Sequence, residues 1–420
     1  MSDRRFARIR WLAPFVLLLA GCAGRGAGEW ADVHEVTPVV LATQAASDAA
    51  LAADPRGHVA LTWVTGDSLG QDLWLALSAD SGLTFAAPVR VNQRRGSVSS
   101  MAECRPIAAY GAGGELLLVW SERRGDSMSV ADLVVRASGD GGRTLGPSVT
   151  VNDDAEDGRP GFHGFPSLAA LPAGGWFAVW VDPREQTATG EDATVASLFS
   201  AMSGDGGLSW SDNRRLATRV CPRCRVTAAA DPSGVVAVAY RPPTDHARDP
   251  VLAVSHDRGT TFSLDTVLPE EGWRLSSCPV DGPSLTMDAS GDGHLAWTTG
   301  AAGGAWIAPW RAGGGLVGLR RQLSDSVVST RHPQLARLGG ATLVAVEGRT
   351  RADRARSVIA VRALESDGTP TPWLFLGVDA RHAWMSRAGE RSALVCWTEH
   401  GAEGNRVRVV RLTRRPSGTS

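Results

Sequence analysis

Short apolar segments that end in an aromatic residue recur along the chain and form its clearest pattern. In seven segments, small and branched apolar residues lead to a final Trp, Tyr or Val, and these final positions lie 49 to 60 residues apart. The segments are His58–Trp63, Leu116–Trp120, Trp176–Trp180, Val235–Tyr240, His294–Trp297, Ala341–Val346 and Ser392–Trp397. A period near fifty residues in an all-β pattern is typical of propeller blades.

Each apolar segment sits in the same surroundings. A glycine turn such as Ala53–Gly57 precedes it, and a third apolar segment such as Asp72–Leu77 follows a variable loop. A tight turn then leads to a fourth segment such as Pro88–Asn92. The pattern predicts four-stranded antiparallel blades over residues 33–414, seven in number, with six as the alternative.

The last unit, residues 381–414, contains only three such segments. The segment His34–Leu41 precedes the first unit and resembles a lone fourth strand. We therefore expect it to pair with the last unit and close the ring without an exposed strand edge.

The tight turn before the fourth segment carries a motif, Ser-x-Asp-x-Gly-x-Thr/Ser followed by an aromatic or Leu. It occurs as Ser78–Phe85, Ser138–Leu145, Ser203–Trp210 and Ser255–Phe262, with Asp80, Asp140, Asp205 and Asp257 as the shared acids. These turns resemble the Asp box of the sialidase or BNR-repeat superfamily. The resemblance implies a sialidase-like propeller whose boxes lie on the outer rim. There the Asp accepts N–H bonds within its own turn, and the glycine takes a conformation closed to other residues. A carbohydrate or ion site at each box is the alternative.

The first residues predict export and anchoring. Arg4, Arg5, Arg8 and Arg10 precede the apolar run Trp11–Ala20, which is too short to span a bilayer. The run closes on Leu19-Ala20-Gly21-Cys22, which resembles the bacterial lipobox. We expect residues 1–22 to be a lipoprotein signal with the lipid on Cys22, residues 23–32 a flexible tether and residues 415–420 a disordered tail. The expected location is the bacterial cell envelope outside the cytoplasm, at the outer membrane or cell surface. A plain secretory signal is the alternative.

Charge narrows the classes of partner. The chain has 43 basic and 44 acidic residues, a net charge of −1. This balance argues against a nucleic-acid binder or a polybasic membrane binder.

Counting back about sixteen residues from each aromatic locates the start of each first strand, where ligands of propellers usually meet the central channel. These starts hold four arginines, three histidines and two acids: Arg105, Arg225, Arg331, Arg381, His163, His332, His382, Asp48 and Asp281. We expect the arginines to bind an anionic ligand, an acidic glycan above all, at one end of the channel.

The family resemblance implies exo-sialidase chemistry, in which an arginine triad holds the substrate carboxylate and a tyrosine is the nucleophile. Arg105, Arg225 and either Arg331 or Arg381 match the triad, and Asp48 or Asp281 the acid. The sequence departs from the family at the nucleophile, because it has only Tyr110, at the far end of a strand, and Tyr240, in a core position. Glycan recognition with or without hydrolysis, a non-catalytic envelope scaffold with a protein partner, and a metal or redox module all stay open.

The cysteines also lie near first-strand starts. Cys104, Cys221, Cys224 and Cys278 do so, whereas Cys396 falls inside a predicted core strand. Three readings compete: a disulfide between Cys278 and one of Cys221 and Cys224, a metal site completed by His163, His332 or His382, and a redox pair.

Overall fold

The structure, a computed structural model, describes residues 30–38, 41, 45–125, 127, 130–155, 161–186, 195–242, 248–267, 273–275, 278–300, 303–402 and 404–415. The predicted signal with Cys22, most of the predicted tether and residues 416–420 of the predicted tail lie outside these residues. The described chain is all-β: its named strands pair antiparallel, and one 3-10 turn, η2 (Pro172–Gly174), is its helical element. No described helix is long and apolar enough to cross a membrane.

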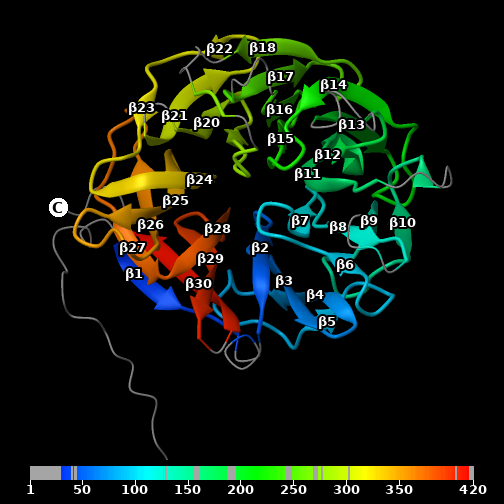
Figure 1. Ribbon diagram of the computed structural model, residues 1–420, viewed down its shortest axis with the longest axis horizontal. Coiled ribbons are helices and arrows are strands. Elements are labelled where there is room, and N and C mark those ends of the chain that lie inside the picture. Colours follow the sequence, from blue (N-terminus) through cyan, green and yellow to red (C-terminus); the bar gives the residue numbers. More distant parts are fainter. Residues whose placement is uncertain are drawn as a thin grey trace, which may run out of the picture.

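The sheets stand side by side around a common centre, in sequence order (Figure 1). The first two units are joined into one nine-stranded sheet by β6 (Val98–Ser99), which pairs with both β4 and β8. Their strands are β2 (Ser47–Ala53), β3 (Val59–Asp67), β4 (Gly70–Ser78), β5 (Val89–Arg90), β7 (Ile107–Tyr110), β8 (Leu116–Arg123), β9 (Ala131–Ser138) and β10 (Ser148–Thr150).

Four further sheets repeat the four-strand order, and the short β23 (Arg321–Gln322) adds to one of them. Their strands are β11 (Gly164–Ala170), β12 (Trp176–Asp182), β13 (Ala196–Ser203), β14 (Arg214–Val220); β15 (Thr227–Ala230), β16 (Val236–Tyr240), β17 (Val251–Ser255), β18 (Ser263–Val267); β19 (Ser284–Met287), β20 (Asp292–Thr299), β21 (Gly304–Arg311), β22 (Gly315–Leu316); and β24 (Val327–Leu338), β25 (Ala341–Thr350), β26 (Val358–Leu364), β27 (Leu374–Val378).

The last sheet combines the two ends of the described chain. It has the order β1-β30-β29-β28, with β1 (Trp30–Glu35), β28 (Ala380–Arg387), β29 (Ser392–Gly401) and β30 (Gly404–Arg414). The joining strand begins earlier than the predicted His34–Leu41, because Trp30 is buried and pairs with Arg414. Residues 30–32, which we expected in the tether, therefore belong to this sheet.

The aromatic-tipped segments are the second strands of these units, as the repeat predicts. Their final side chains are at most 8% exposed: Trp63, Trp120, Trp180, Tyr240, Trp297, Val346 and Trp397. The apolar clusters extend across neighbouring sheets; one joins Val238 of β16 to Phe177 and Val179 of β12. Both faces of each second strand are thus buried, which explains why these strands are continuous apolar runs.

The four Asp-containing turns have one hydrogen-bonding pattern. In the turn before β10, the Ser138 hydroxyl and the backbone N–H of Thr144 each donate to Asp140 Oδ1 at 2.8 Å, and the Thr144 hydroxyl donates to Oδ2 at 2.7 Å. These bonds to Thr144 and Ser138 lower the pKa of Asp140 to about 2. The same bonds recur around Asp80, Asp205 and Asp257. Each turn is therefore held in its conformation by hydrogen bonds among its own residues.

Candidate functional site

Four of the first strands begin with the same irregularity. In β2, β11 and β28 the strand carries one extra residue relative to its partner, as in the step from Ser47↔Val64 to Ala50↔Thr62, and β24 carries two such bulges in succession. At the same place in each bulge a non-glycine residue has positive φ: Asp48 (53°), Phe165 (53°), His332 (49°) and His382 (55°). Bulges re-aim side chains, and left-handed non-glycine residues cluster at functional sites.

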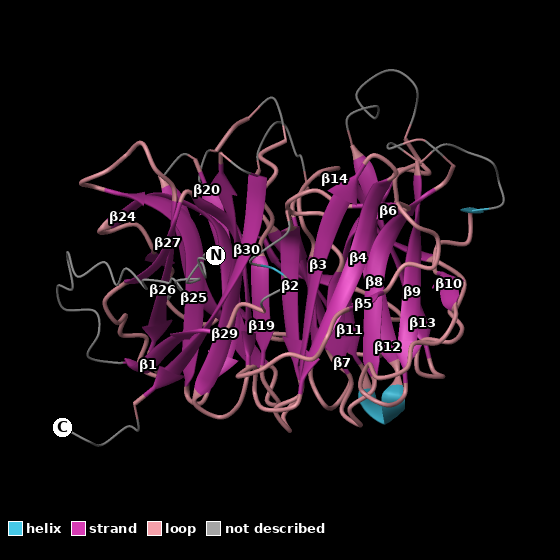
Figure 2. Ribbon diagram, turned by 90° about the horizontal axis from the view of Figure 1, so that it is seen from below, coloured by secondary structure: helices cyan, strands magenta, loops and turns pink. Residues whose placement is uncertain are grey.

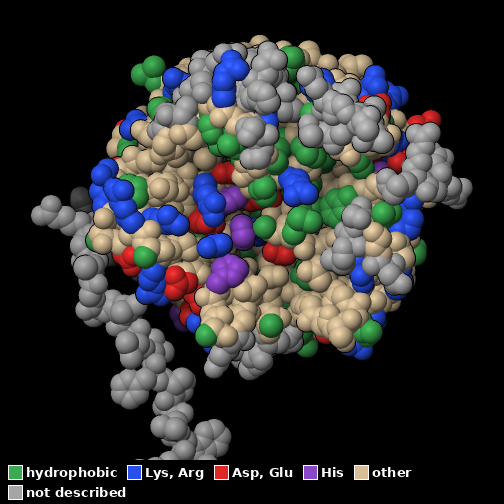
Figure 3. Space-filling view, in the orientation of Figure 1, with side chains coloured by type: hydrophobic (Ala, Val, Ile, Leu, Met, Phe, Trp, Pro, Cys, Tyr) green, Lys and Arg blue, Asp and Glu red, His purple; other side chains and the backbone are tan. Residues whose placement is uncertain are grey.

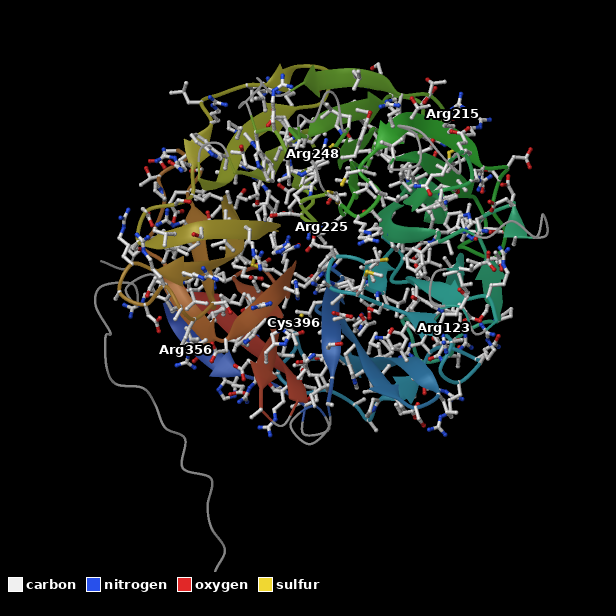
Figure 4. All side chains as sticks on the ribbon, in the orientation of Figure 1. Arg123, Arg215, Arg225, Arg248, Arg356 and Cys396 are labelled. Carbon is white, nitrogen blue, oxygen red and sulfur yellow. The ribbon has the colours of Figure 1, made fainter. Side chains whose placement is uncertain are left out.

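These bulges lie where first strands enter the sheets. Figure 2 shows the strands running between two faces, with η2, which joins a first to a second strand, at the lower face. The first strands therefore begin at the opposite face of the ring, which we call the axial face. In Figure 3, histidine, basic and acidic side chains gather at the centre of the molecule. Figure 4 places Arg225 near the ring centre and Arg123, Arg215 and Arg356 toward its edge.

A buried ion pair forms the middle of this region. Arg225 Nη1 donates to both carboxylate oxygens of Glu103, at 2.8 and 3.0 Å, and both side chains are at most 5% exposed. Arg225 Nη2 donates to the carbonyls of Gly282, Pro283 and Pro333. Burial opposes ionisation of Glu103, but the charges of Arg225 and His332 hold the pKa of its carboxyl well below the usual range. This pair connects segments from four different units.

Two histidines lie beside the pair. His332 Nδ1 is 3.2 Å from Glu103 Oε1 and 3.8 Å from Asp281 Oδ1, and the backbone N–H of His332 donates to Asp281 Oδ2. Although burial disfavours its charge, Asp281 and Glu103 raise the pKa of His332. The ring of His382 lies 5.4 Å away, and burial together with Arg105 lowers the pKa of His382 to about 3. The charged form of the His332 imidazole is thus favoured by its acidic neighbours, whereas the His382 imidazole is neutral near neutral pH. We call Glu103, Arg225, Asp281, His332, His382 and Glu347 the axial cluster.

The structure does not assemble the four predicted arginines into one clamp. Arg105 is 3% exposed and donates to the carbonyls of Ala102, Ala49 and His382. Arg225 is committed to Glu103 and to carbonyls. Both guanidinium groups hold the protein together rather than facing a ligand.

The two predicted acids are also engaged. Asp48 accepts the Ser100 hydroxyl at 2.7 Å and the Ala102 N–H at 3.1 Å. Asp281 is 2% exposed and lies against His332. Neither is an open acid/base of the kind that the family resemblance implies.

The other two arginines are exposed. Arg331 and Arg381 occupy the same position in the bulges of β24 and β28, opposite Glu347 and Thr398. The Arg331 side chain is 48% exposed and donates to Glu347 Oε1 at 2.7 and 3.0 Å. Glu347 Oε2 in turn accepts a hydrogen bond from the backbone N–H of His382. The buried cluster is thereby linked to an exposed cationic rim.

His163 lies outside this cluster. Its ring contacts the Ala131 carbonyl at 2.8 Å, Asp154 at 3.1 Å and Asp182 at 3.5 Å. Despite burial, Asp154 and Asp182 raise its pKa. The side chain is 1% exposed and links Ala131 and Asp154 of the preceding unit to Asp182 of β12, so it braces the junction between two units.

Three of the cysteines converge. Cys278 Sγ lies 2.6 Å from Cys221 Sγ and 3.5 Å from Cys224 Sγ, and all three thiols are free. These sulfur–sulfur distances are longer than the about 2.05 Å of a disulfide bond, so the structure does not show the predicted disulfide. Cys104 and the three predicted histidines are not members of this group. The sulfur of Cys104 instead accepts the Phe165 N–H, and Cys396 is buried in β29 as expected.

Neither tyrosine belongs to the axial cluster. The Tyr110 hydroxyl donates to the Gly141 carbonyl in an Asp-containing turn, at the opposite face. Tyr240 ends β16 in the core, where burial raises its pKa. The tyrosine nucleophile implied by the family resemblance therefore has no counterpart within the axial cluster.

Sequence reasoning missed Glu103 and Glu347. Glu347 follows the last residue of its second-strand segment, a position held by Val64, Ser121 and Val181 in other units. A charged residue at a position that those units fill with small or apolar residues was a usable signal. A second charged residue, Arg241, stands at the same position in another unit and is also buried. Glu103 carried no comparable signal.

A second hollow lies away from the axis. This cavity of 620 Å³ is bordered by strands of the β19–β22 and β24–β27 sheets. Four of its charged side chains pair with one another: Arg311 with Asp292, and Arg337 with Asp288.

No protein-family model and no curated protein matches the sequence. Solved structures do. The polysaccharide lyase Uly1 aligns with a TM-score of 0.54 and 12% identity over 89% of this chain and 90% of its own. A protein of unknown function from Dyadobacter fermentans gives 0.53 and 16%, over 76% and 97%. An ulvan lyase gives 0.52 and 11%, over 88% and 97%.

The fold is of the propeller type. At identities this low the likeness shows the propeller-type fold and nothing finer. A Hadza microbial sialidase aligns at a TM-score of 0.49, which is too low to support a sialidase assignment.

Proposed function

We propose that this propeller-type protein is a lipid-anchored envelope protein that binds an acidic glycan at its axial face, with Arg331 and Arg381 contacting the ligand's carboxylates. One observation carries the proposal: first strands from several units meet at a buried charged cluster, and two arginines on its rim stay exposed. Ligands of propeller-type folds commonly meet this end of the channel.

The proposal includes seven blades. Two four-strand runs within the nine-stranded sheet, four further sheets and the β1-containing sheet make seven units of one pattern. The last unit would close the ring against the first. Three contacts support this closure: Trp384 donates to the Leu51 carbonyl, Arg411 to the Ser81 carbonyl, and Arg105 to the His382 carbonyl.

The chemistry of the rim favours a carboxylated sugar. A guanidinium forms paired N–H···O bonds with a carboxylate, and two of them at equivalent positions in neighbouring units suit a repeating anionic polymer. The neutral imidazole of His382 adds a group able to accept a hydrogen bond from a sugar hydroxyl. Among the similar structures, one ulvan lyase is described as bound to -[GlcA(1-4)Rha3S]-, a saccharide with an acidic sugar.

The proposal is one of recognition and does not include tyrosine-based hydrolysis. Neither tyrosine belongs to the axial cluster. The Tyr110 hydroxyl is bonded to a turn at the opposite face, and Tyr240 is packed in the core. Asp48 and Asp281 are held by their own neighbours.

Calorimetric titration tests this function. We expect oligogalacturonate to bind and its carboxyl-reduced form to bind at least tenfold more weakly. Arg381→Gln should weaken oligogalacturonate binding about tenfold, because it removes one paired contact. Arg215→Gln, another exposed arginine, which lies toward the edge of the ring in Figure 4 and pairs with Glu185, is the matched control. Equal binding of the acidic and reduced glycans, or unchanged binding by Arg381→Gln, would contradict the proposal.

The lipid anchor has its own test. Metabolic labelling with a fatty acid should mark the wild-type chain and leave Cys22→Ser unmarked, with the label in the membrane fraction. Labelling of Cys22→Ser would contradict the predicted site.

A further inference from the structure

Three cysteines from two neighbouring units point their sulfurs at one another. Cys221 follows β14 directly, Cys224 precedes β15, and Cys278 precedes β19. Cys221 and Cys224 are each 3% exposed, and Cys278 is partly exposed. Their sulfurs all lie within 4.8 Å of one another.

The third cysteine distinguishes this cluster from a pair of cysteines that could form one disulfide bridge. A single disulfide uses two sulfurs, yet Cys278 is in contact with both Cys221, at 2.6 Å, and Cys224, at 3.5 Å. Three thiolates around one ion with bonds of about 2.3 Å would stand about 4 Å apart. Small rotations of the side chains would bring the observed sulfurs to that spacing.

We propose that Cys221, Cys224 and Cys278 form a binding site for a soft monovalent d10 cation, copper(I), with three sulfur ligands. Soft thiolates select copper(I), whereas structural zinc sites usually have four protein ligands. Among the groups of potential ligands that the described residues form, the one that contains these three cysteines holds sulfur alone. This site goes beyond glycan recognition and does not depend on it.

Binding of Cu⁺ would displace the thiol protons of Cys221, Cys224 and Cys278, which would pass to the solvent, and three thiolates would then surround the cation.

The bound ion would connect two segments that reach the axial cluster. Arg225 follows Cys224 directly and donates to the carbonyls of Gly282 and Pro283, which follow Cys278 closely. A Cβ at Gly282 would clash with the Arg225 carbonyl, so these two segments already touch. Metal binding would therefore stabilise the start of β15 against the start of β19.

The test is an anaerobic titration of the phosphine-reduced full-length protein with copper(I), in competition with bicinchoninate. We expect one equivalent to be retained and the melting temperature to rise, because a ligand that binds the folded state stabilises it. Cys224→Ser and Cys278→Ser should each lower the copper(I) affinity at least tenfold. Cys104→Ser, which alters a cysteine outside the group, should bind as wild type.

Three results would overturn the proposal: no copper(I) retained by the reduced wild type, unchanged affinity in both Cys224→Ser and Cys278→Ser, or retention of zinc(II) in preference to copper(I). Melting curves of the metal-free variants establish that each is folded. Arg381→Gln should retain copper(I) fully, so failure of the glycan proposal and failure of the metal proposal are separate results.

Discussion

The two faces of the ring are held together in different ways. At the face that carries the Asp-containing turns, here called the turn face, the bonds to the Asp of each turn link residues no more than four positions apart, as from Thr144 to Asp140. At the axial face, Arg225 reaches Glu103 across 122 positions and Arg105 reaches the His382 carbonyl across 277. The turn face therefore repeats in sequence, whereas the axial face exists only when the whole chain has folded.

The largest effect is expected at the axial ion pair. Glu103→Gln removes the carboxylate that faces both Arg225 and His332, and leaves the buried Arg225 guanidinium without its anionic partner. We expect a loss of about 3–5 kcal/mol in the free energy of unfolding, measured by chemical denaturation. Asp67→Asn, in the exposed pair with Arg95, is the control and should change little. Equal effects of the two substitutions would show that burial of the ion pair contributes nothing to its importance for stability.

A smaller effect is expected from the invariant glycine of an Asp-containing turn. Gly259 has φ +91°, and a Cβ there would lie 2.6 Å from Cδ2 of the buried Phe177 ring. Gly259→Ala should destabilise the protein by about 2–3 kcal/mol, from backbone strain and overpacking together.

The neighbouring turn supplies the control. Gly206 also has positive φ but has open space around its Cβ, and Ser81 and Arg258 occupy the same turn position elsewhere. Gly206→Ala should therefore cost about 1 kcal/mol at most, since only strain remains. A cost as large as that of Gly259→Ala would show that packing against the neighbouring sheet is unimportant.

Acid should weaken the axial face through His382. Its folded pKa of about 3 is below that of a free imidazole, near 6.5, so between these values the unfolded chain binds more protons. Stability is thus lost as pH falls from about 6.5 toward 3, by at most about 1.4 kcal/mol per pH unit. Denaturation at pH 7 and pH 5 should show a smaller loss for His382→Gln than for wild type. The control His34→Gln, on the exposed β1, should follow wild type.

This contrast explains what the sequence could predict. The second strands, the Asp-containing turns and the three-stranded last unit were visible because each is set by local, repeated residues such as Asp140 and Trp180. The convergence of first-strand starts followed from the same repeat.

The roles of residues at the axial face could not be read in that way. Arg105 and Arg331 stand at similar repeat positions, yet one is buried against carbonyls and the other is half exposed. What separates them is the partner: Arg105 donates to backbone carbonyls that include the distant His382, whereas Arg331 meets Glu347 of the next strand, and no local pattern specifies either choice. The bulges that aim His332 and His382 likewise left no turn signal that differs from a regular strand.

Ligand-dependent hydrogen exchange tests the central claim most directly. With saturating oligogalacturonate, the account predicts slower exchange in peptides covering residues 328–335 and 379–385, and unchanged exchange in the turn peptides covering residues 78–85 and 138–145. Protection confined to the turn peptides, or none in the bulges of β24 and β28, would contradict it.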